Sequence, residues 1–216
     1  KQVRNTLARF GANEVLTYSF VSERLLRKAG QDAKNSYKIV NSISPYLQYV
    51  RQSIVPSLLE KTYLNEKLPV EKFAIVEMNK VYQKMWGLDG EKVPVEKMQI
   101  GMVIAERKNT GTAYYKAKKY VEELLGELNI SVKFLPIKGD IAMSKPFEPK
   151  RAAEIWVDEE CVGVVGEFKN SVRQSFKLAE YLAGFELDLD IVLEKANGKK
   201  EIYLGEIEKR DLTVKT

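Results

Sequence analysis

The chain has 216 residues, a length that suits one large domain or two small ones with a sizeable buried core. It is 44% hydrophobic and 30% charged, and it contains no histidine and a single cysteine, Cys161. These totals exclude histidine-dependent nucleophilic catalysis, a histidine zinc site and an internal disulfide. The net charge of +5 permits a nucleic-acid partner, but 35 basic residues among 30 acidic ones are equally typical of a solvated mixed surface.

The sequence shows neither a membrane span nor a signal peptide. No apolar run approaches the roughly 20 residues that cross a bilayer, and the first ten residues lack the apolar segment of a secretory signal. With one cysteine, which we expect to be a small buried apolar residue, the chain fits a reducing, cytoplasmic setting. Because it does not begin with methionine, we expect an excerpt or a processed product.

The N-terminal segment predicts a helix, a strand and a second helix. Helical periodicity predicts a helix over residues 2–10 that Gly11 ends. Alternating Val, Thr, Tyr and Phe predict a strand over 14–21. Ser22 is a suitable N-cap for a short helix over 23–29.

The next segment leads into a longer helix. A short strand over residues 37–40 is joined by a turn-rich connector to an extended stretch over 48–51. A helix over 54–67 follows, with Ser53 as its expected cap. Pro56 lies in its first turn, where a missing N–H costs little.

The remainder is dominated by strands. Further strands are predicted over residues 73–78, 81–84, 98–105, 132–135, 152–157, 162–168 and 183–187. Further helices are predicted over 113–128, 171–177 and 191–195, the last capped by Asp188. A tight turn at Asn79 and Lys80 should divide the first two strands, and residues 158–161 should close a hairpin. Regular βαβ alternation is missing, so we expect an α+β domain with a mostly antiparallel sheet flanked by helices.

Six segments occur in an order that identifies a family. They are residues 11–21 (GANEVLTYSFV), Asn41 with Ser44, residues 51–59 (RQSIVPSLL), Glu77 with Val81 and Tyr82, Gly163 with Gly166 and Glu167, and residues 186–189 (ELDL). In this order they resemble the β subunit of bacterial phenylalanyl-tRNA synthetase over about residues 1–195. Ser42, Gln52, Ser57 and Asn79 depart from the family pattern. Residues 169–170 replace its His-Pro pair, which puts any role of that histidine in doubt.

The resemblance implies a fold, a role and partners. The fold would be a class II aminoacyl-tRNA synthetase-like antiparallel sheet, with residues 1–195 as a non-catalytic core domain. Residues 196–216 would be a linker and the truncated first strand of a following anticodon-binding domain. The partner would be the α subunit in an (αβ)2 heterotetramer that meets tRNA and uses ATP and Mg²⁺, with no cofactor in this segment.

The signature of adenylation chemistry is absent from the sequence. A class II active site grips phosphate with an arginine in an F-R-x-E strand and another in a G-x-G-x-x-R segment, because guanidinium binds phosphate in a bidentate manner. Here Arg51 is followed by Gln52 and Ser53, and the Gly163–Gly166 pair is followed by Glu167. We therefore expect no catalytic, cofactor-binding or metal-binding residue in this chain.

Six residues remain as structural or interface candidates: Asn41, Arg51, Pro56, Glu77, Gly166 and Glu167. Arg51 and the two glutamates lie near strand ends in apolar company, where they form either a ligand-gripping cluster or a buried ion pair. Buried charges are usually paired, so we expect Arg51 to pair with Glu77 or Glu167.

Three functions stay open at this stage. The leading one is a non-catalytic core that supports the α subunit. The alternative is a free-standing RNA-binding or regulatory paralogue, which the basic balance allows. A self-sufficient adenylating enzyme is disfavoured by the missing arginines. The lysine cluster at residues 116–119 either touches phosphate or covers an amphipathic helix, and the helix over 54–67 either belongs to the core or packs on a partner.

Overall fold

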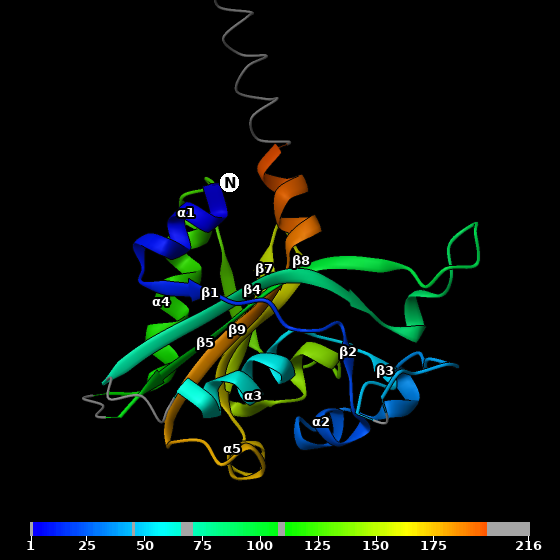
Figure 1. Cartoon of the computed structure of the whole chain (residues 1–216). Coiled ribbons are helices and arrows are strands. Elements are labelled where there is room, and N and C mark those ends of the chain that lie inside the picture. Colours follow the sequence, from blue (N-terminus) through cyan, green and yellow to red (C-terminus); the bar gives the residue numbers. More distant parts are fainter. Residues whose placement is uncertain (1, 45, 66–70, 108–110, 198–216) are drawn as a thin grey trace, which may run out of the picture.

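A seven-stranded sheet forms the centre of the molecule (Figure 1). The computed structural model describes residues 2–44, 46–65, 71–107 and 111–197. The strand order is β1-β4-β5-β9-β8-β7-β6, in which β1 pairs with β4 in parallel and every other neighbouring pair is antiparallel. The strands are β1 (Ala12–Glu14), β4 (Lys72–Tyr82), β5 (Glu96–Glu106), β6 (Lys133–Pro136), β7 (Phe147–Val157), β8 (Glu160–Phe168) and β9 (Tyr181–Asp188). The predicted α+β class with a mostly antiparallel sheet is confirmed.

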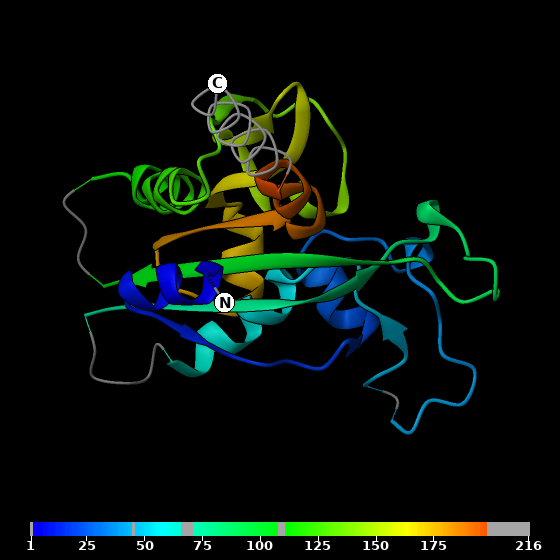
Figure 2. The same ribbon diagram turned by 90° about the horizontal axis from the view of Figure 1, so that it is seen from above.

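Helices cover both faces of the sheet (Figures 1 and 2). One face carries α1 (Gln2–Arg9), α4 (Ala113–Gly126) and the helical residues 189–197; the other carries α2 (Glu23–Lys28), α3 (Val55–Asn65) and α5 (Asn170–Phe176). Short 3-10 turns are η1 (Ala33–Asn35), η2 (Lys84–Trp86) and η3 (Ala142–Ser144). We call the two sides the α4 face and the α3 face.

Each face has its own apolar core, because successive strand residues point to opposite sides. Val76 and Met102 join the core of the α4 face, whereas Ile75 and Val103 join that of the α3 face. A separate two-stranded sheet, β2 (Phe20–Val21) with β3 (Tyr49–Val50), lies beside the α3 face. The residues between β1 and β2 link the two sheets.

Three strand predictions were wrong. The strand expected over residues 14–21 is replaced by two short strands, β1, which ends at Glu14, and β2 (Phe20–Val21), with no strand between them. The turn expected at Asn79 and Lys80 does not exist: β4 is continuous, and these residues pair with Gln99 and Met98 on β5. Asparagine is typical of turns, but eleven consecutive cross-strand pairs with β5 outweigh that local preference. The strand expected over 37–40 is only an isolated bridge between Lys38 and Tyr49.

Several local predictions were confirmed. The Ser22 hydroxyl accepts from the Leu25 N–H at 3.0 Å, and the Asp188 carboxylate accepts from the Ile191 N–H at 3.2 Å. Asp158 and Glu159 form the two-residue turn between β7 and β8, with φ of 45° and 70°.

The C-terminal boundary and the cysteine differ in detail from expectation. Ala196, assigned to a linker, is buried in the core of the α4 face. The remaining linker and strand expected beyond it, residues 198–216, lie outside the described residues. Cys161 is half-buried rather than buried, and desolvation raises the pKa of its thiol. In the described part of the chain, no helix is both long and apolar enough to cross a membrane.

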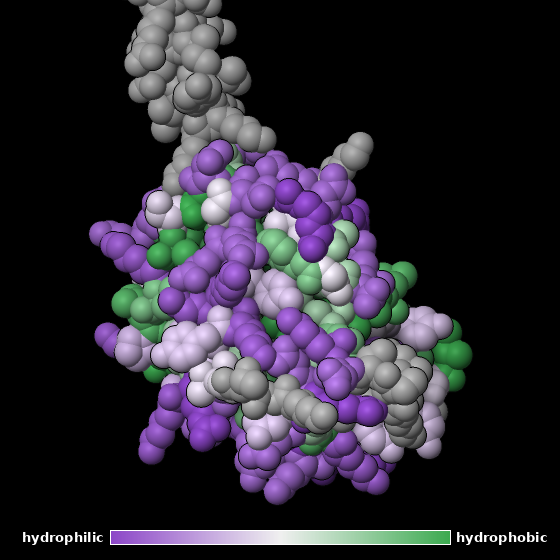
Figure 3. Space-filling view, turned by 90° about the vertical axis from the view of Figure 1, so that its left-hand side faces the viewer, coloured by the Kyte–Doolittle hydropathy of each residue, from purple (hydrophilic) through white to green (hydrophobic). Residues whose placement is uncertain are grey.

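The lysine cluster on α4 pairs with acids. Lys118 and Lys119 form i,i+4 ion pairs with Glu122 and Glu123, and Lys116 pairs with Glu106 on β5. The side of the molecule that carries α1 and α4 is largely hydrophilic (Figure 3). Of the two interpretations of this cluster, the pairing favours a solvated amphipathic helix.

Candidate functional site

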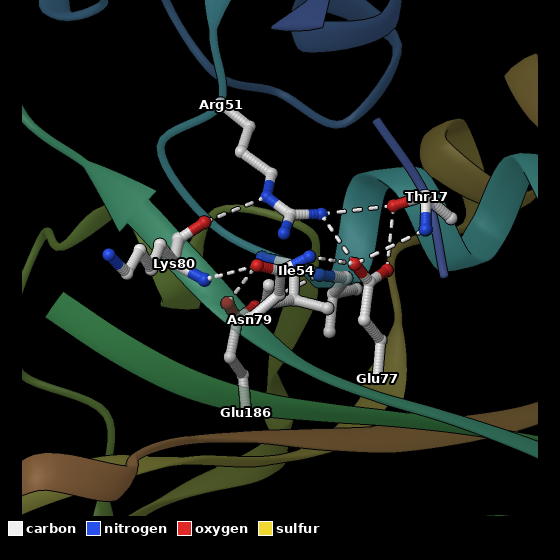
Figure 4. Close-up of polar contacts among 8 residues, drawn as sticks. Thr17, Arg51, Ile54, Glu77, Asn79, Lys80 and Glu186 are labelled. Carbon is white, nitrogen blue, oxygen red and sulfur yellow. Dashed lines mark hydrogen bonds and ion pairs between the residues drawn. The ribbon is translucent and has the colours of Figure 1, made fainter. Parts of the chain in front are cut away.

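A row of three residues crosses the α3 face of the sheet. Glu77 on β4 lies opposite Gly101 on β5, which lies opposite Glu186 on β9. Both glutamate side chains are fully buried. The row therefore places one carboxyl group on each side of Gly101, directly beneath the start of α3 (Figure 4).

Glu186 caps α3. Its two carboxyl oxygens accept hydrogen bonds from the backbone N–H groups of Ile54 and Val55, the latter at 3.2 Å. The N-terminus of a helix leaves such N–H groups unpaired and carries a partial positive charge, so a carboxyl group there is stabilising. The predicted cap, Ser53, was wrong: its hydroxyl instead accepts from the Gln31 amide at 2.6 Å. Pro56 lies in the first turn of α3, as predicted.

Gly101 allows α3 to approach the sheet. A Cβ atom at this position would lie 2.9 Å from Cγ2 of Ile54 and 3.4 Å from Cδ1 of Leu58. Ile54 therefore occupies the space above Gly101, between the two carboxyl groups.

Arg51 lies inside the protein and is paired with Glu77. Its side chain is 1% exposed, and its Nη1 donates to Glu77 Oε1 at 3.0 Å and to Thr17 Oγ1 at 2.9 Å. Its Nε donates to the backbone carbonyl of Lys80 at 3.0 Å. The pairing of Arg51 with Glu77 is confirmed. Glu167, the other partner considered, instead pairs with Arg151 at 3.1 Å.

Glu77 also holds the segment between β1 and β2. Its carboxylate accepts from the Thr17 hydroxyl at 2.6 Å, from the Thr17 N–H at 3.3 Å and from the Asn79 amide at 3.0 Å. The backbone N–H of Arg51 donates to the Ser19 carbonyl at 2.9 Å. The buried charges thus fasten Thr17 to β4 (Figure 4), and the backbone of Arg51 holds Ser19.

The two carboxyl groups differ in their electrostatic environments. Burial raises the pKa of Glu186 to about 8, although the Ile54 and Val55 N–H groups and Arg51 favour its charged form. The Glu77 carboxylate adds to the increase. Glu77 has the direct ion pair with Arg51. The Arg51 guanidinium and the Glu77 carboxylate therefore offset each other as an ion pair, while the raised pKa of Glu186 favours its protonated form near neutral pH.

The other candidate residues do not join this row. Asn41 is exposed in a turn. Gly166 lies on β8, where an added Cβ would come within 2.2 Å of the Ala152 Cβ on β7, so the two strands require glycine there. Glu167 follows it and also accepts from the Tyr114 N–H at 3.3 Å, which links β8 to the start of α4.

Three contributors to the row were missed from the sequence: Glu186, Gly101 and Thr17. Glu186 belongs to one of the family segments, and its alternation with Asp188 within an apolar strand was an available signal of two acids on one face. The roles of Gly101 and Thr17 depend on which distant residues the fold brings close.

The row is a poor match for ATP or Mg²⁺. The Glu77 oxygens contact Arg51, Thr17 and Asn79, and the Glu186 oxygens cap α3. Among the described residues, no cluster of three or more acidic or cysteine side chains has the geometry to hold a metal ion. The arrangement binds parts of the protein to each other, and no chemical step is assigned to it.

Comparisons with known proteins identify relatives of this chain. The model of the phenylalanyl tRNA synthetase beta chain CLM domain matches residues 1–189. A phenylalanine–tRNA ligase beta subunit from Carboxydothermus hydrogenoformans is 28% identical over 200 residues, which are 88% of this chain and 24% of that protein. One from Cupriavidus pinatubonensis is 30% identical over 206 residues, covering 89% and 24% of the two chains. The chain spans about a quarter of the length of these relatives.

A solved structure shares the fold. The pyrrolysyl tRNA synthetase PylSc of Desulfitobacterium hafniense superposes with a TM-score of 0.68 over 91% of this chain and 67% of its own length, at 12% identity. The fold is that of a class II tRNA synthetase, as the resemblance implied.

Proposed function

The chain belongs to the phenylalanyl-tRNA synthetase beta chain family, and from this membership we propose that it is the non-catalytic core of a β subunit. In this proposal it supports a catalytic α subunit within a cytoplasmic (αβ)2 heterotetramer. The α subunit joins phenylalanine to its tRNA with ATP and Mg²⁺, and this chain meets tRNA through the assembled enzyme.

The observation that carries the proposal is the position of Arg51. An arginine that grips ATP must present its guanidinium to a phosphate. The Arg51 guanidinium is instead buried, and it binds Glu77, Thr17 and the Lys80 carbonyl. These contacts favour a supporting role over adenylation.

An exposed apolar surface supports association with a partner. Leu16, Tyr18, Val40, Ile43 and Tyr46, which we call the apolar strip, are all at least 74% exposed. Tyr18 and Tyr46 line one pocket, so the two segments that supply the strip lie next to each other. The loop with Val40 and Ile43 extends away from the body of the molecule (Figure 2). Contiguous exposed apolar residues mark interaction surfaces.

The buried network and the apolar strip are connected through Thr17. Thr17 binds Glu77 on the inner side of the segment, while its neighbours Leu16 and Tyr18 are exposed. Fixing Thr17 therefore fixes the outward direction of these two side chains. In the proposed role, the buried charges hold the partner-binding surface in shape.

Phenylalanine-dependent ATP–pyrophosphate exchange tests the absence of chemistry. We expect no exchange by the chain alone and exchange by a complex that contains the α subunit. Exchange by the chain alone would establish the adenylating alternative. Salt-sensitive tRNA binding without capture of the α subunit would instead favour the RNA-binding paralogue.

A further inference from the structure

A pocket beside the apolar strip has the composition of a ligand site. It has a volume of about 470 Å³ and lies between α2, α3 and the residues that lead into β2. This volume is within the range of small-molecule sites. Thr17, which binds Glu77, lines this pocket, whereas Glu77, Gly101 and Glu186 are not among its lining residues.

Three basic residues line this pocket, and the ammonium of one of them, Lys28, also lies 5.0 Å from the centroid of the Phe176 ring. Arg24 and Lys28 come from α2 and Lys61 from α3, while Glu60 is the acidic residue in the lining. The excess of positive charge favours an anionic ligand. A guanidinium beside ammonium groups is suited to phosphate, because it can donate two parallel hydrogen bonds.

Aromatic rings form another part of the lining. Tyr18 is 76% exposed, Tyr46 is 74% exposed and Phe20 is 48% exposed. Flat exposed rings next to cationic groups are the arrangement that binds single-stranded nucleic acid, with bases stacked on rings and phosphates on the cations. The aromatic rings thus add a preference for a ligand that carries a planar ring.

A buried hydroxyl supplies an independent observation. Ser57 on α3 lines the pocket and is only 4% exposed, yet its Oγ has no hydrogen-bond partner among the described residues. In the same helix, the Thr62 hydroxyl donates to the Leu58 carbonyl at 2.9 Å. Buried hydroxyl groups are rarely left unpaired. The Ser57 Oγ is closed off in the pocket wall, so it can reach a ligand in the pocket only after a rotation of its side chain.

We propose that this pocket binds a nucleotide unit, with the phosphate at Arg24 and the lysines and the base on the tyrosine rings. The nucleotide unit comes either from a free mononucleotide or from a single-stranded RNA segment. After a rotation of its side chain, Ser57 provides a hydrogen bond to the ligand. The site shares Tyr18 and Tyr46 with the apolar strip, so a base on these rings and a partner on the strip would compete, whereas Arg24, Lys28 and Lys61 lie outside the strip.

Binding measurements with two probes test the site. The 216-residue chain is titrated with AMP by calorimetry, and with a fluorescent single-stranded RNA of about eight nucleotides by anisotropy. Binding of AMP identifies a free nucleotide as sufficient, whereas binding of the RNA alone identifies a strand. Adenosine, which lacks the phosphate, should bind at least about tenfold more weakly than AMP.

Matched variants separate a specific site from general attraction to a basic protein. Arg24→Glu should weaken binding by about tenfold or more, because it reverses the charge that meets the phosphate. Ser57→Ala should weaken it by about fivefold without loss of thermal stability, since it removes an unpaired buried hydroxyl. Lys133→Glu makes the same charge change on β6, at the opposite edge of the sheet from β1, and should alter affinity by less than about twofold.

Two results would overturn the site. One is the absence of binding by either probe near physiological salt. The other is equal weakening by Arg24→Glu and Lys133→Glu, which would show a non-specific effect of net charge. Capture of the α subunit is measured in parallel on Ser57→Ala, so failure of this site is distinguished from failure of the assembly role.

Discussion

The buried row and the apolar strip reverse the usual distribution of residues. Glu77 and Glu186 of the row, together with Arg51, lie inside the protein, where charged groups are rare unless they are paired. In the strip, Leu16 and Ile43 lie almost fully in solvent. Each of these buried charged residues has at least one hydrogen-bond partner, although Arg51 Nη2 has none among the described residues. The side chains of the strip instead remain exposed to solvent in the described part of the chain.

The difference indicates what each region does. A charge with its partners within the chain stabilises a conformation and is not available for a substrate. An apolar side chain without a partner within the chain is available for another molecule. The contrast predicts that changes in the row alter stability, and that changes in the strip alter assembly.

The largest expected effect is that of Arg51→Ala. Removing Arg51 leaves the Glu77 carboxylate buried without its ion pair, which typically costs about 3–5 kcal/mol. The free energy of unfolding, measured by urea denaturation, should fall by that amount. The control is Arg4→Ala, which breaks the exposed pair with Glu14 and should cost less than about 1 kcal/mol. Equal losses from the two substitutions would refute a structural role for the buried pair.

Gly101→Ala tests the seat of α3 on the sheet. The new methyl group would lie 2.9 Å from Ile54 Cγ2, and such overpacking typically costs about 1–3 kcal/mol. Gly126→Ala at the end of α4 is the matched control, because a Cβ there meets nothing within 4 Å. It should leave stability unchanged or raise it by up to about 1 kcal/mol. An unaltered melting temperature for Gly101→Ala would contradict close packing of Ile54 on α3 against Gly101.

The raised pKa of Glu186 predicts a pH dependence. Between the unfolded value of about 4.3 and the folded value of about 8, the folded chain keeps a proton that the unfolded chain has lost. The contribution of Glu186 to the free energy of unfolding is therefore fully present below about pH 4.3 and decreases as the pH rises toward 8. The decrease is up to about 1.4 kcal/mol per pH unit. Unfolding curves at pH 6 and pH 7 measure this slope.

Glu186→Gln isolates this contribution from other titrating groups. The amide does not titrate, so the variant should lose the part of the slope that belongs to Glu186, although its overall stability also falls because the amide caps α3 less well. Identical slopes in the variant and the parent chain would show that Glu186 is already ionised at pH 6.

The smallest effect on stability is expected in the strip. Ile43 is fully exposed, so Ile43→Asp should change the free energy of unfolding by no more than about 0.5 kcal/mol. Thermal unfolding measures this directly. A loss of several degrees would mean that Ile43 packs within this chain and would remove it from the strip.

The sequence allowed prediction of those features that depend on residue type and on neighbouring residues, such as helix caps and the pairing of buried charges. Caps such as Ser22 and Asp188 followed from residue type, and the Arg51–Glu77 pair followed from the rule that buried charges are partnered. Glu186 was missed because its partner Ile54 lies 132 residues away, and only the register of β9 brings them together. Gly101 was missed for the same reason, since its role depends on the side chain of Ile54 above it.

Size-exclusion chromatography with light scattering tests the central claim most directly. The chain is co-expressed with the α subunit, as the parent sequence and as the double variant Leu16→Asp/Ile43→Asp. We predict that the parent chain elutes as a complex of both subunits, and that the double variant elutes alone with an unchanged melting temperature. Co-elution of the double variant with the α subunit as complete as that of the parent would contradict the account.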